Sequence, residues 1–186
     1  VSLAFNRQKW LEYFSGRIEL ANGPVPPGAD GFLGTPGKYS VYDLERAKAH
    51  LAKAGYKNGI DPATGKPHVQ MFEQAGSDTA YRLMAELFAL DLQALGIVLK
   101  PEFNNRARFL QKLAQGQMQL FRLSWTGDYP DAENFLQLFY GPNSGASNRV
   151  CYSSEAFDRE FEAVRAMPDS PERNRMTLEY PRTFIR

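Results

Sequence analysis

Cysteine is nearly absent from the sequence, which contains Cys151 alone. A single cysteine cannot form a disulfide within the chain, so cysteine content does not indicate the redox compartment. Histidine is almost as scarce, and neither His50 nor His68 lies in a sequence context typical of a catalytic triad. We therefore expect Cys151 to be a partly buried small residue beside Tyr152 rather than a nucleophile.

Long apolar runs and an excess of one charge are also missing. No stretch of about 18 apolar residues occurs, so no segment is predicted to span a bilayer. The opening residues, VSLAFNRQKW, lack the basic, apolar and cleavage regions of a secretory signal. The 22 basic and 21 acidic residues nearly cancel, for a formal charge of +1. This balance argues against nucleic acid or an anionic membrane as the main partner and favours a ligand that is small or only locally charged.

The sequence also lacks the motifs of phosphate, metal and acid–base chemistry. The glycine-rich stretches GPNSGAS and PGADGFLGTPG do not have the strand and helix context of a phosphate-binding loop. Asp128, Asp131 and Glu133 place three carboxylates within six residues, but without the alternating spacing and central glycine of a calcium loop. We therefore expect no metal site, no cofactor and no catalytic residue, and a hydrolase using Asp128 and Glu133 is only a rival hypothesis.

Hydrophobic material, by contrast, is sufficient for a folded core, at 43% hydrophobic and 13% aromatic residues. From residue 68 to 125 the strand-like runs PHVQMFEQ, GIVLKPEF and MQLFRLSW alternate with helical patterns over 77–96 and 106–117. On the second of these helices we expect Phe109, Leu110 and Leu113 to face the core. The alternation is typical of a βαβαβ, mostly parallel sheet covered by helices, so the predicted fold class is α/β.

Further helices are predicted on both sides of this region. One covers residues 3–16, and another runs from an Asp43 cap to a Gly55 stop. Between them, residues 21–38 hold four prolines and five glycines, which predicts a loop. Three more helices are expected around 133–140, around 154–167 and from Ser170 onward. The expected organisation is an N-terminal helix with a Pro/Gly-rich connecting segment (1–40), an α/β ligand-binding lobe (41–180) and a tail (181–186).

The stretch SWTGDYPDAENF, residues 124–135, places a carboxylate just past the third predicted strand. Ligands of open α/β sheets bind beyond the carboxyl ends of the strands. There Asp128 would form a charge-assisted hydrogen bond with a ligand ammonium, and Trp125 would form an apolar or cation–π wall. A structural alternative stays open, in which Asp128 satisfies backbone N–H groups of its own turn and Asp131 caps the following helix.

Three segments carry a resemblance to a known family: YSVYDLERAKAHLAKAGYKNG, SWTGDYPDAENFLQLF and SNRVCYSSEAFDREFEAVR. In the same order, they resemble segments of the family 5 extracellular solute-binding proteins, the oligopeptide and dipeptide receptors of ABC importers. The resemblance covers residues 1 to about 180 and corresponds to the C-terminal portion of a longer receptor.

The resemblance implies a two-lobed α/β protein, with a lobe like those of periplasmic binding proteins, that closes on its ligand and has no catalytic activity. In peptide-binding members, it implies that Asp128 pairs with the α-amino group of the peptide and that Trp125 lines a side-chain pocket. Backbone groups near Thr126 and Gly127 would pair with the extended ligand as an added strand.

Departures from the family pattern and the breadth of the family keep the cargo open. Ser124 and Ala132 stand where the pattern has Gly and Pro, and the closing EYPRTFIR does not match it. Other members bind metal chelates, sugars or opines, or act as ligand-sensing regulatory domains. Arg122, Arg106 and Arg108 are nearby cations for a ligand carboxylate, although we expect the last two on a solvated helix face. The resemblance further implies a monomeric periplasmic receptor, or an extracellular membrane-associated lipoprotein, whose partners are ABC permease subunits.

Overall fold

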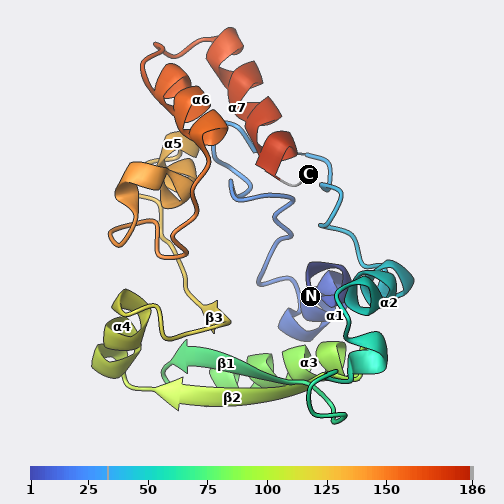
Figure 1. The fold of residues 1–186 in the computed structure, drawn as a ribbon. Coiled ribbons are helices and arrows are strands. Elements are labelled where there is room, and N and C mark those ends of the chain that lie inside the picture. Colours follow the sequence, from blue (N-terminus) through green and yellow to red (C-terminus); the bar gives the residue numbers. More distant parts are fainter. Residues whose placement is uncertain (33, 185–186) are drawn as a thin grey trace. The chain divides into compact units, whose positions relative to one another are not determined.

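The computed structural model describes residues 1–32 and 34–184, without the side chains of 178–184 (Figure 1). The chain forms two compact units. Unit 1 comprises Val1–Gly16 and Val41–Ser124, and unit 2 comprises Arg17–Ser40 and Trp125–Arg186. The division into 1–40, 41–180 and 181–186 stays a prediction, and the last two residues of the expected tail lie outside the described residues.

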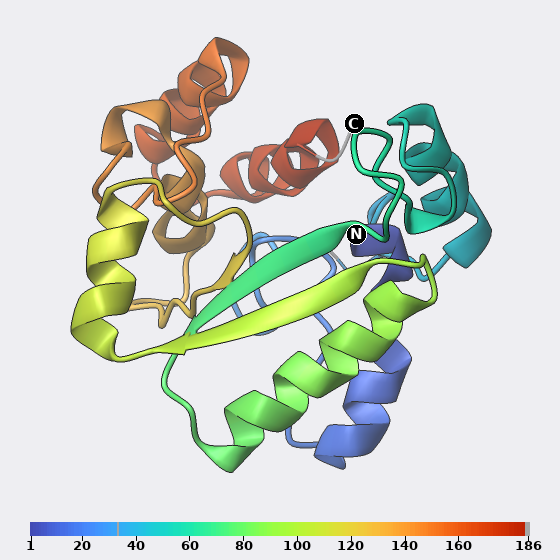
Figure 2. The ribbon, with the colours of Figure 1, turned by 60° about the horizontal axis from the view of Figure 1, so that its bottom comes forward.

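Unit 1 is built on a three-stranded parallel sheet with the strand order β2-β1-β3. The strands are β1 (Val69–Ala75), β2 (Val98–Asn104) and β3 (Phe121–Arg122), and the crossovers contain α3 (Thr79–Gln93) and α4 (Arg106–Ala114). Register runs from Val69 opposite Val98 to Ala75 opposite Asn104. Figure 2 shows α3 lying along the two long strands. The predicted strand–helix–strand–helix–strand order and the α/β fold class are confirmed.

Local side-chain contacts explain where the helices of unit 1 begin. Asp78 caps α3 by accepting a hydrogen bond from the Tyr81 N–H at 3.0 Å, and Asn105 caps α4 through the Arg108 N–H at 2.9 Å. The predicted Asp43 cap is confirmed, because its carboxylate accepts from the Arg46 N–H at 2.9 Å. That helix is α2 (Leu44–Lys53), and it is followed by the short helix η2 (Lys57–Gly59).

The turn after α3 requires glycine. Gly96 has a φ of +77°, and a Cβ at this position would lie 2.2 Å from the backbone oxygen of Asn58. The turn therefore packs directly on η2 and sets the start of β2.

Aromatic side chains cover both faces of the sheet. On one face Phe72 of β1 contacts Phe88 of α3 with ring centroids 5.5 Å apart, and Phe5 contacts the same Phe88 ring at 5.8 Å. On the other face Phe109 of α4 contacts Phe121 of β3 at 6.4 Å. The helix α4 is also held by Lys112, which pairs with the buried carboxylate of Glu73.

Three expectations for unit 1 were wrong in detail. Leu110 is 39% exposed, because α4 presents only Phe109 and Leu113 to the sheet. The predicted helix over 3–16 is divided into η1 (Ser2–Ala4) and α1 (Arg7–Phe14), since the Asn6 side chain caps α1 through the Lys9 N–H at 3.2 Å.

The third expected strand is also far shorter than the run MQLFRLSW. Only Phe121 and Arg122 pair with β1, while Leu123 and Trp125 are 48% and 41% exposed. Alternation in the sequence therefore overstated the length of pairing, which depends on a partner strand.

Unit 2 is a helical unit around one apolar cluster. Its helices are α5 (Ala132–Leu136), η3 (Gln137–Phe139), η4 (Gly141–Asn143), α6 (Glu155–Arg165) and α7 (Pro171–Phe184). The cluster consists of Val25, Ala132, Leu136, Phe157, Phe161 and Val164. Ser154 caps α6 and Ser170 caps α7, which confirms the predicted helices in this part of the sequence. No described helix combines the length and the apolar character needed to cross a membrane.

Cys151 is exposed, contrary to the expectation that it is partly buried. It has a φ of +51° in the loop before α6. The buried Asn148 side chain donates to the Tyr152 C=O at 2.8 Å and accepts from the Tyr152 N–H at 3.1 Å. These bonds direct Tyr152 toward the apolar cluster and leave Cys151 facing out.

Candidate functional site

The segment from Trp125 to Pro130 leads into α5 and carries the residues that the sequence singled out. Trp125 is held by its indole N–H, which donates to the Asn134 side-chain oxygen at 2.8 Å. Asn134 lies on α5 and is 1% exposed. This hydrogen bond fixes one edge of the ring while much of the indole surface stays open, as a wall of a binding site requires.

Asp128 lies in a bend and is exposed. Its carboxylate makes no hydrogen bond or ion pair with the described residues. The contacts therefore give no support to the alternative in which Asp128 satisfies N–H groups of its own turn.

Asp131, three residues further on, is committed to structural contacts. One of its oxygens accepts from the Glu133 N–H at 2.7 Å, which confirms the predicted helix cap. Both oxygens accept from the Arg173 guanidinium of α7, at 2.6 and 3.0 Å. These bonds hold the pKa of Asp131 below its ordinary value and raise the pKa of Arg173. Sequence reasoning missed Arg173, because 42 residues separate it from Asp131.

The three acids of this stretch therefore do not share a site. Asp131 pairs with Arg173, and Glu133 pairs with Arg165 at 3.4 Å. Among the residues that the structure describes, no group of three or more His, Cys, Asp or Glu side chains is placed to hold a metal ion.

A cavity of about 330 Å³ lies beside Asp128. Two segments of unit 2 line it together with one residue of α5: Pro26, Pro27, Gly28, Ala29, Gly127, Asp128, Tyr129, Pro130 and Phe135. We call residues 26–29 the strap. The sequence predicted a loop here but gave no sign that it meets the motif around Asp128.

Gly127 and Thr126 form the remaining part of the predicted site. A Cβ at Gly127 would lie 2.7 Å from the Phe135 ring, so this position has no room for a side chain. The backbone N–H and C=O groups of Thr126 and Gly127 make no hydrogen bond with the described residues, and thus stay available to an external partner.

The cations that the sequence suggested for a ligand carboxylate lie in unit 1. Arg122 stacks over the Tyr81 ring, with its guanidinium carbon 5.3 Å from the centroid. Arg108 pairs with Glu102 at 3.2 Å on the exposed side of α4, and Arg106 is exposed as well. The expectation of a solvated helix face is confirmed for these last two.

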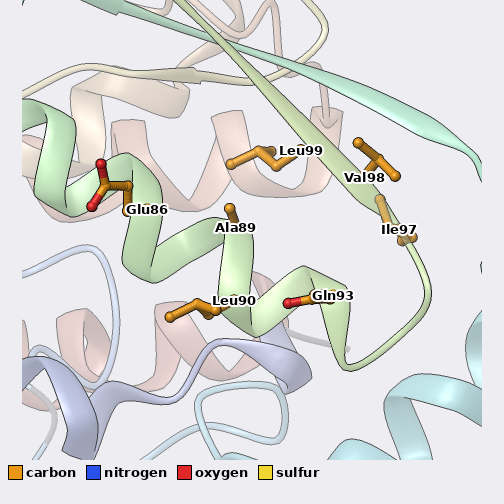
Figure 3. Close-up of a pocket in the computed structure, with 7 residues that line it drawn as sticks. All are labelled: Glu86, Ala89, Leu90, Gln93, Ile97, Val98 and Leu99. Atoms are coloured by element: carbon orange, nitrogen blue, oxygen red, sulfur yellow. The ribbon is translucent and has the colours of Figure 1, made fainter.

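A second cavity, of about 480 Å³, lies within unit 1 between α3 and β2. Figure 3 shows its lining, which is mostly aliphatic and has Glu86 and Gln93 at its polar points. It lacks the convergent polar groups that orient a specific small ligand, so the cavity beside Asp128 is the better candidate.

Comparison with known proteins decides the family. Residues 1–147 match the model of the "Bacterial extracellular solute-binding proteins, family 5 Middle". The chain belongs to this family. The resemblance seen in the sequence motifs is thereby confirmed.

Individual relatives of the family 5 chain differ in their named ligands. This chain is 28% identical to Heme-binding protein A of Haemophilus influenzae, over 88% of this chain and 29% of that protein. It is also 28% identical to Di/tripeptide-binding protein 2 of Pseudomonas aeruginosa, over 99% of this chain and 34% of that protein. The chain thus spans about a third of the length of these relatives. Both are named for binding rather than for catalysis.

The fold of the family 5 chain has a close counterpart among solved structures. The structure of HbpA2 from Haemophilus parasuis superimposes with a TM-score of 0.85 at 22% identity, over 98% of this chain and 36% of that one. At this identity the likeness supports the fold alone.

Proposed function

We propose that the family 5 chain is part of the substrate-binding component of an ABC importer, and that it binds peptides through the Asp128 carboxylate. The observation that carries the proposal is an exposed carboxylate without a described partner at the edge of a cavity. A charge-assisted hydrogen bond from a ligand ammonium would satisfy it, with a net gain of about 1.5–3 kcal/mol.

The surrounding groups suit the rest of a peptide. The half-exposed Trp125 ring offers a wall for a side chain, since its indole N–H is already bonded to Asn134. The free backbone groups of Thr126 and Gly127 would pair with the ligand backbone in the manner of an added strand. The relatives named for di- and tripeptides support this ligand class.

We also propose a location and partners for the whole protein. The receptor would act outside the cytoplasm, in the periplasm or at the outer face of a membrane, as the family description indicates. It would act as a monomer and deliver its cargo to the membrane subunits of the importer.

A second candidate ligand is heme, because a relative of equal identity is named for heme. Heme carries carboxylates and no primary amine, so its binding would not use Asp128 as an ammonium partner. Peptide binding would therefore depend on the Asp128 carboxylate, whereas heme binding would not.

Calorimetric titration of the full-length parent protein with a tripeptide tests the proposal. Asp128→Asn should weaken binding by at least about 1.5 kcal/mol. N-acetylation of the peptide should cost a similar amount, and the two losses should not add, because both remove the same pair.

A matched control is Glu160→Gln, which removes an exposed carboxylate of α6 outside the cavity and should leave affinity unchanged. If acetylated and free peptides bind equally well, Asp128 is not the amine anchor. Tight heme binding that is insensitive to Asp128→Asn, in a protein that ignores peptides, would establish the second candidate instead.

A further inference from the structure

The segment Trp125–Pro130, which we call the binding segment, rests on the helix α5. The Trp125 indole N–H is bonded to the Asn134 side chain at 2.8 Å. Gly127 lies against Phe135, because a Cβ at this glycine would approach the aromatic ring to 2.7 Å. At its end the binding segment runs directly into the residue that caps α5. The position of the binding segment therefore follows the position of α5.

The helix α5 is too short to fix its own position. It contains five residues, and isolated helices of fewer than about 12 residues are marginal in water. Ala132 and Leu136 bury it in the apolar cluster of unit 2, but apolar burial is not directional. Its cap Asp131 supplies the direction, since both carboxylate oxygens accept from the Arg173 guanidinium, at 2.6 and 3.0 Å. Bidentate pairs of this kind add geometric specificity.

Arg173 is itself held firmly between helices. Its side chain is 7% exposed, and its Nε donates to the Val164 C=O, near the end of α6, at 3.3 Å. Its backbone N–H donates to the Ser170 hydroxyl at the start of α7. The guanidinium thus joins α5, α6 and α7 at one point. A lysine could keep the charge there, but it lacks the planar fork that forms two parallel bonds.

The same part of α7 also supports the strap. The Thr177 hydroxyl donates to the Arg173 C=O at 2.8 Å, and a Cβ at Gly31 would lie 2.5 Å from the Thr177 methyl carbon. Just after the strap, the Asp30 N–H donates to the Pro130 C=O at 3.0 Å. The binding segment is therefore held from α5 and from the strap side, and both supports meet α7 around Arg173.

We propose that Arg173 is a positioning residue for ligand binding, which acts through Asp131 and α5 to set the direction of the Asp128 carboxylate. This inference rests on the proposed function and adds to it a residue outside the cavity lining. Hydrogen bonds weaken steeply with poor distance or angle, whereas apolar contacts are not directional. Displacement of the binding segment therefore weakens the pair between Asp128 and the ligand amine more than the contact with the Trp125 ring.

The test compares free and N-acetylated Ala-Ala-Ala in calorimetric titrations of the full-length parent protein. In the wild type we expect the free-amine peptide to bind about tenfold tighter than the acetylated one. Arg173→Lys keeps a positive charge beside Asp131 but loses the fork, and should reduce this preference to about twofold. The loss should fall mainly on the free-amine peptide.

This preference separates positioning from a purely structural role. If Arg173→Lys only lowers the fraction of protein able to bind, both peptides lose apparent affinity by the same factor. An unchanged preference in the folded variant therefore overturns the inference. Arg175→Lys is the matched control, because Arg175 is an exposed arginine of the same helix that pairs with Glu172 at 3.9 Å. It should leave the preference at the wild-type value.

Asp131→Glu is a second variant in case Arg173→Lys fails to fold. It keeps both charges of the pair but lengthens the cap of α5 by one methylene, so it should lower the preference in the same way. A wild-type preference in this variant also contradicts the positioning role. If the wild-type protein itself is indifferent to N-acetylation, the Asp128 anchor is overturned, so failure of the proposed function is distinguishable from failure of the inference.

Discussion

At the scale of single residues, two aspartates three positions apart differ because of their surroundings. Asp131 is enclosed by the bidentate Arg173 guanidinium and a backbone N–H, whereas Asp128 is exposed. Arg173 itself is 7% exposed, and its Nε donates to the Val164 C=O at 3.3 Å. The exposed Asp169 carboxylate adds a longer contact at 3.5 Å. This nearly buried cation therefore depends mainly on Asp131 to balance its charge.

Replacement of Asp131 by Asn should therefore destabilise unit 2. We expect a loss of about 2 kcal/mol in the free energy of unfolding, because Arg173 would lose its bidentate counter-ion and keep only the exposed Asp169 carboxylate at 3.5 Å. Glu133→Gln is the control, since it removes only the exposed pair with Arg165 and should cost under about 0.5 kcal/mol. Denaturant unfolding followed by Trp125 fluorescence, in a protein that carries Trp10→Phe, measures both.

The pH dependence of this difference follows from the pKa of Asp131. Hydrogen bonds from Arg173 depress that pKa in the folded state below the ordinary value of 3.8, so the folded state binds the proton more weakly than the unfolded state. The stabilisation is complete above the unfolded pKa and is lost as pH falls through the folded pKa. The gap between wild type and Asp131→Asn should thus be constant near neutral pH and close in strong acid. A gap that is independent of pH would contradict the ionic origin.

At the scale of elements, what the sequence predicted well is local. The Asp43 cap and the stop at Gly55 act within a few residues, so they are visible in the sequence itself. The order of strands and helices followed from periodicity in the same way.

What escaped prediction depends on residues far apart in sequence. The length of β3 is set by how much of β1 it meets, and the Asp131–Arg173 pair spans 42 residues. The strap is placed beside the candidate site by the residue that follows it, Asp30, which contacts Pro130 and Asp131. Asp128 was singled out because it follows a strand end and matches a motif, whereas nothing local indicated the cavity beside it.

In the strand β2, one proline protects the open edge of the sheet against pairing with another chain. In the described sheet β2 lies at an edge, and its Val98 N–H bonds to the His68 C=O of the β1 side at 2.9 Å. Backbone N–H and C=O groups of successive residues point to opposite sides of a strand. Those of Leu99, Pro101 and Phe103 therefore point toward the open edge. Proline has no N–H to offer there, which is a known protection against pairing with another chain.

Pro101→Val should therefore increase self-association. The change supplies an N–H in the middle of the open edge together with a residue that favours strands. Sedimentation of the 186-residue chain at increasing concentration should detect larger species in this variant than in the wild type. Pro62→Val, in the exposed turn before β1, is the control and should behave like the wild type. Equal sedimentation of all three proteins would show that Pro101 does not protect the edge.

At the scale of the whole molecule, each unit is assembled from two separate stretches of chain. The chain passes between the units after Gly16, Ser40 and Ser124. In unit 1 the opening residues complete the core, since the Asn6 N–H donates to the Asp91 carboxylate at 3.1 Å. Neither unit can therefore be complete before distant parts of the sequence meet.

The two tryptophans allow the stability of each unit to be measured separately. Trp10 belongs to unit 1 and contacts the Phe5 ring at 4.9 Å, whereas Trp125 belongs to unit 2. Replacing either tryptophan with Phe leaves a single reporter. Phe88 and Phe161 are matched core positions, buried in unit 1 and in unit 2 respectively.

We expect Phe161→Ala to lower the stability reported by Trp125 by about 3–5 kcal/mol, since it opens a cavity in the apolar cluster of unit 2. The unfolding midpoint reported by Trp10 should shift much less. Phe88→Ala should give the reverse pattern. This outcome is expected if each unit is stabilised mainly by contacts within itself, as the division of the chain into two compact units indicates. Equal shifts at both reporters for both substitutions would instead mean that the units unfold as one, and that the core of each depends on the other.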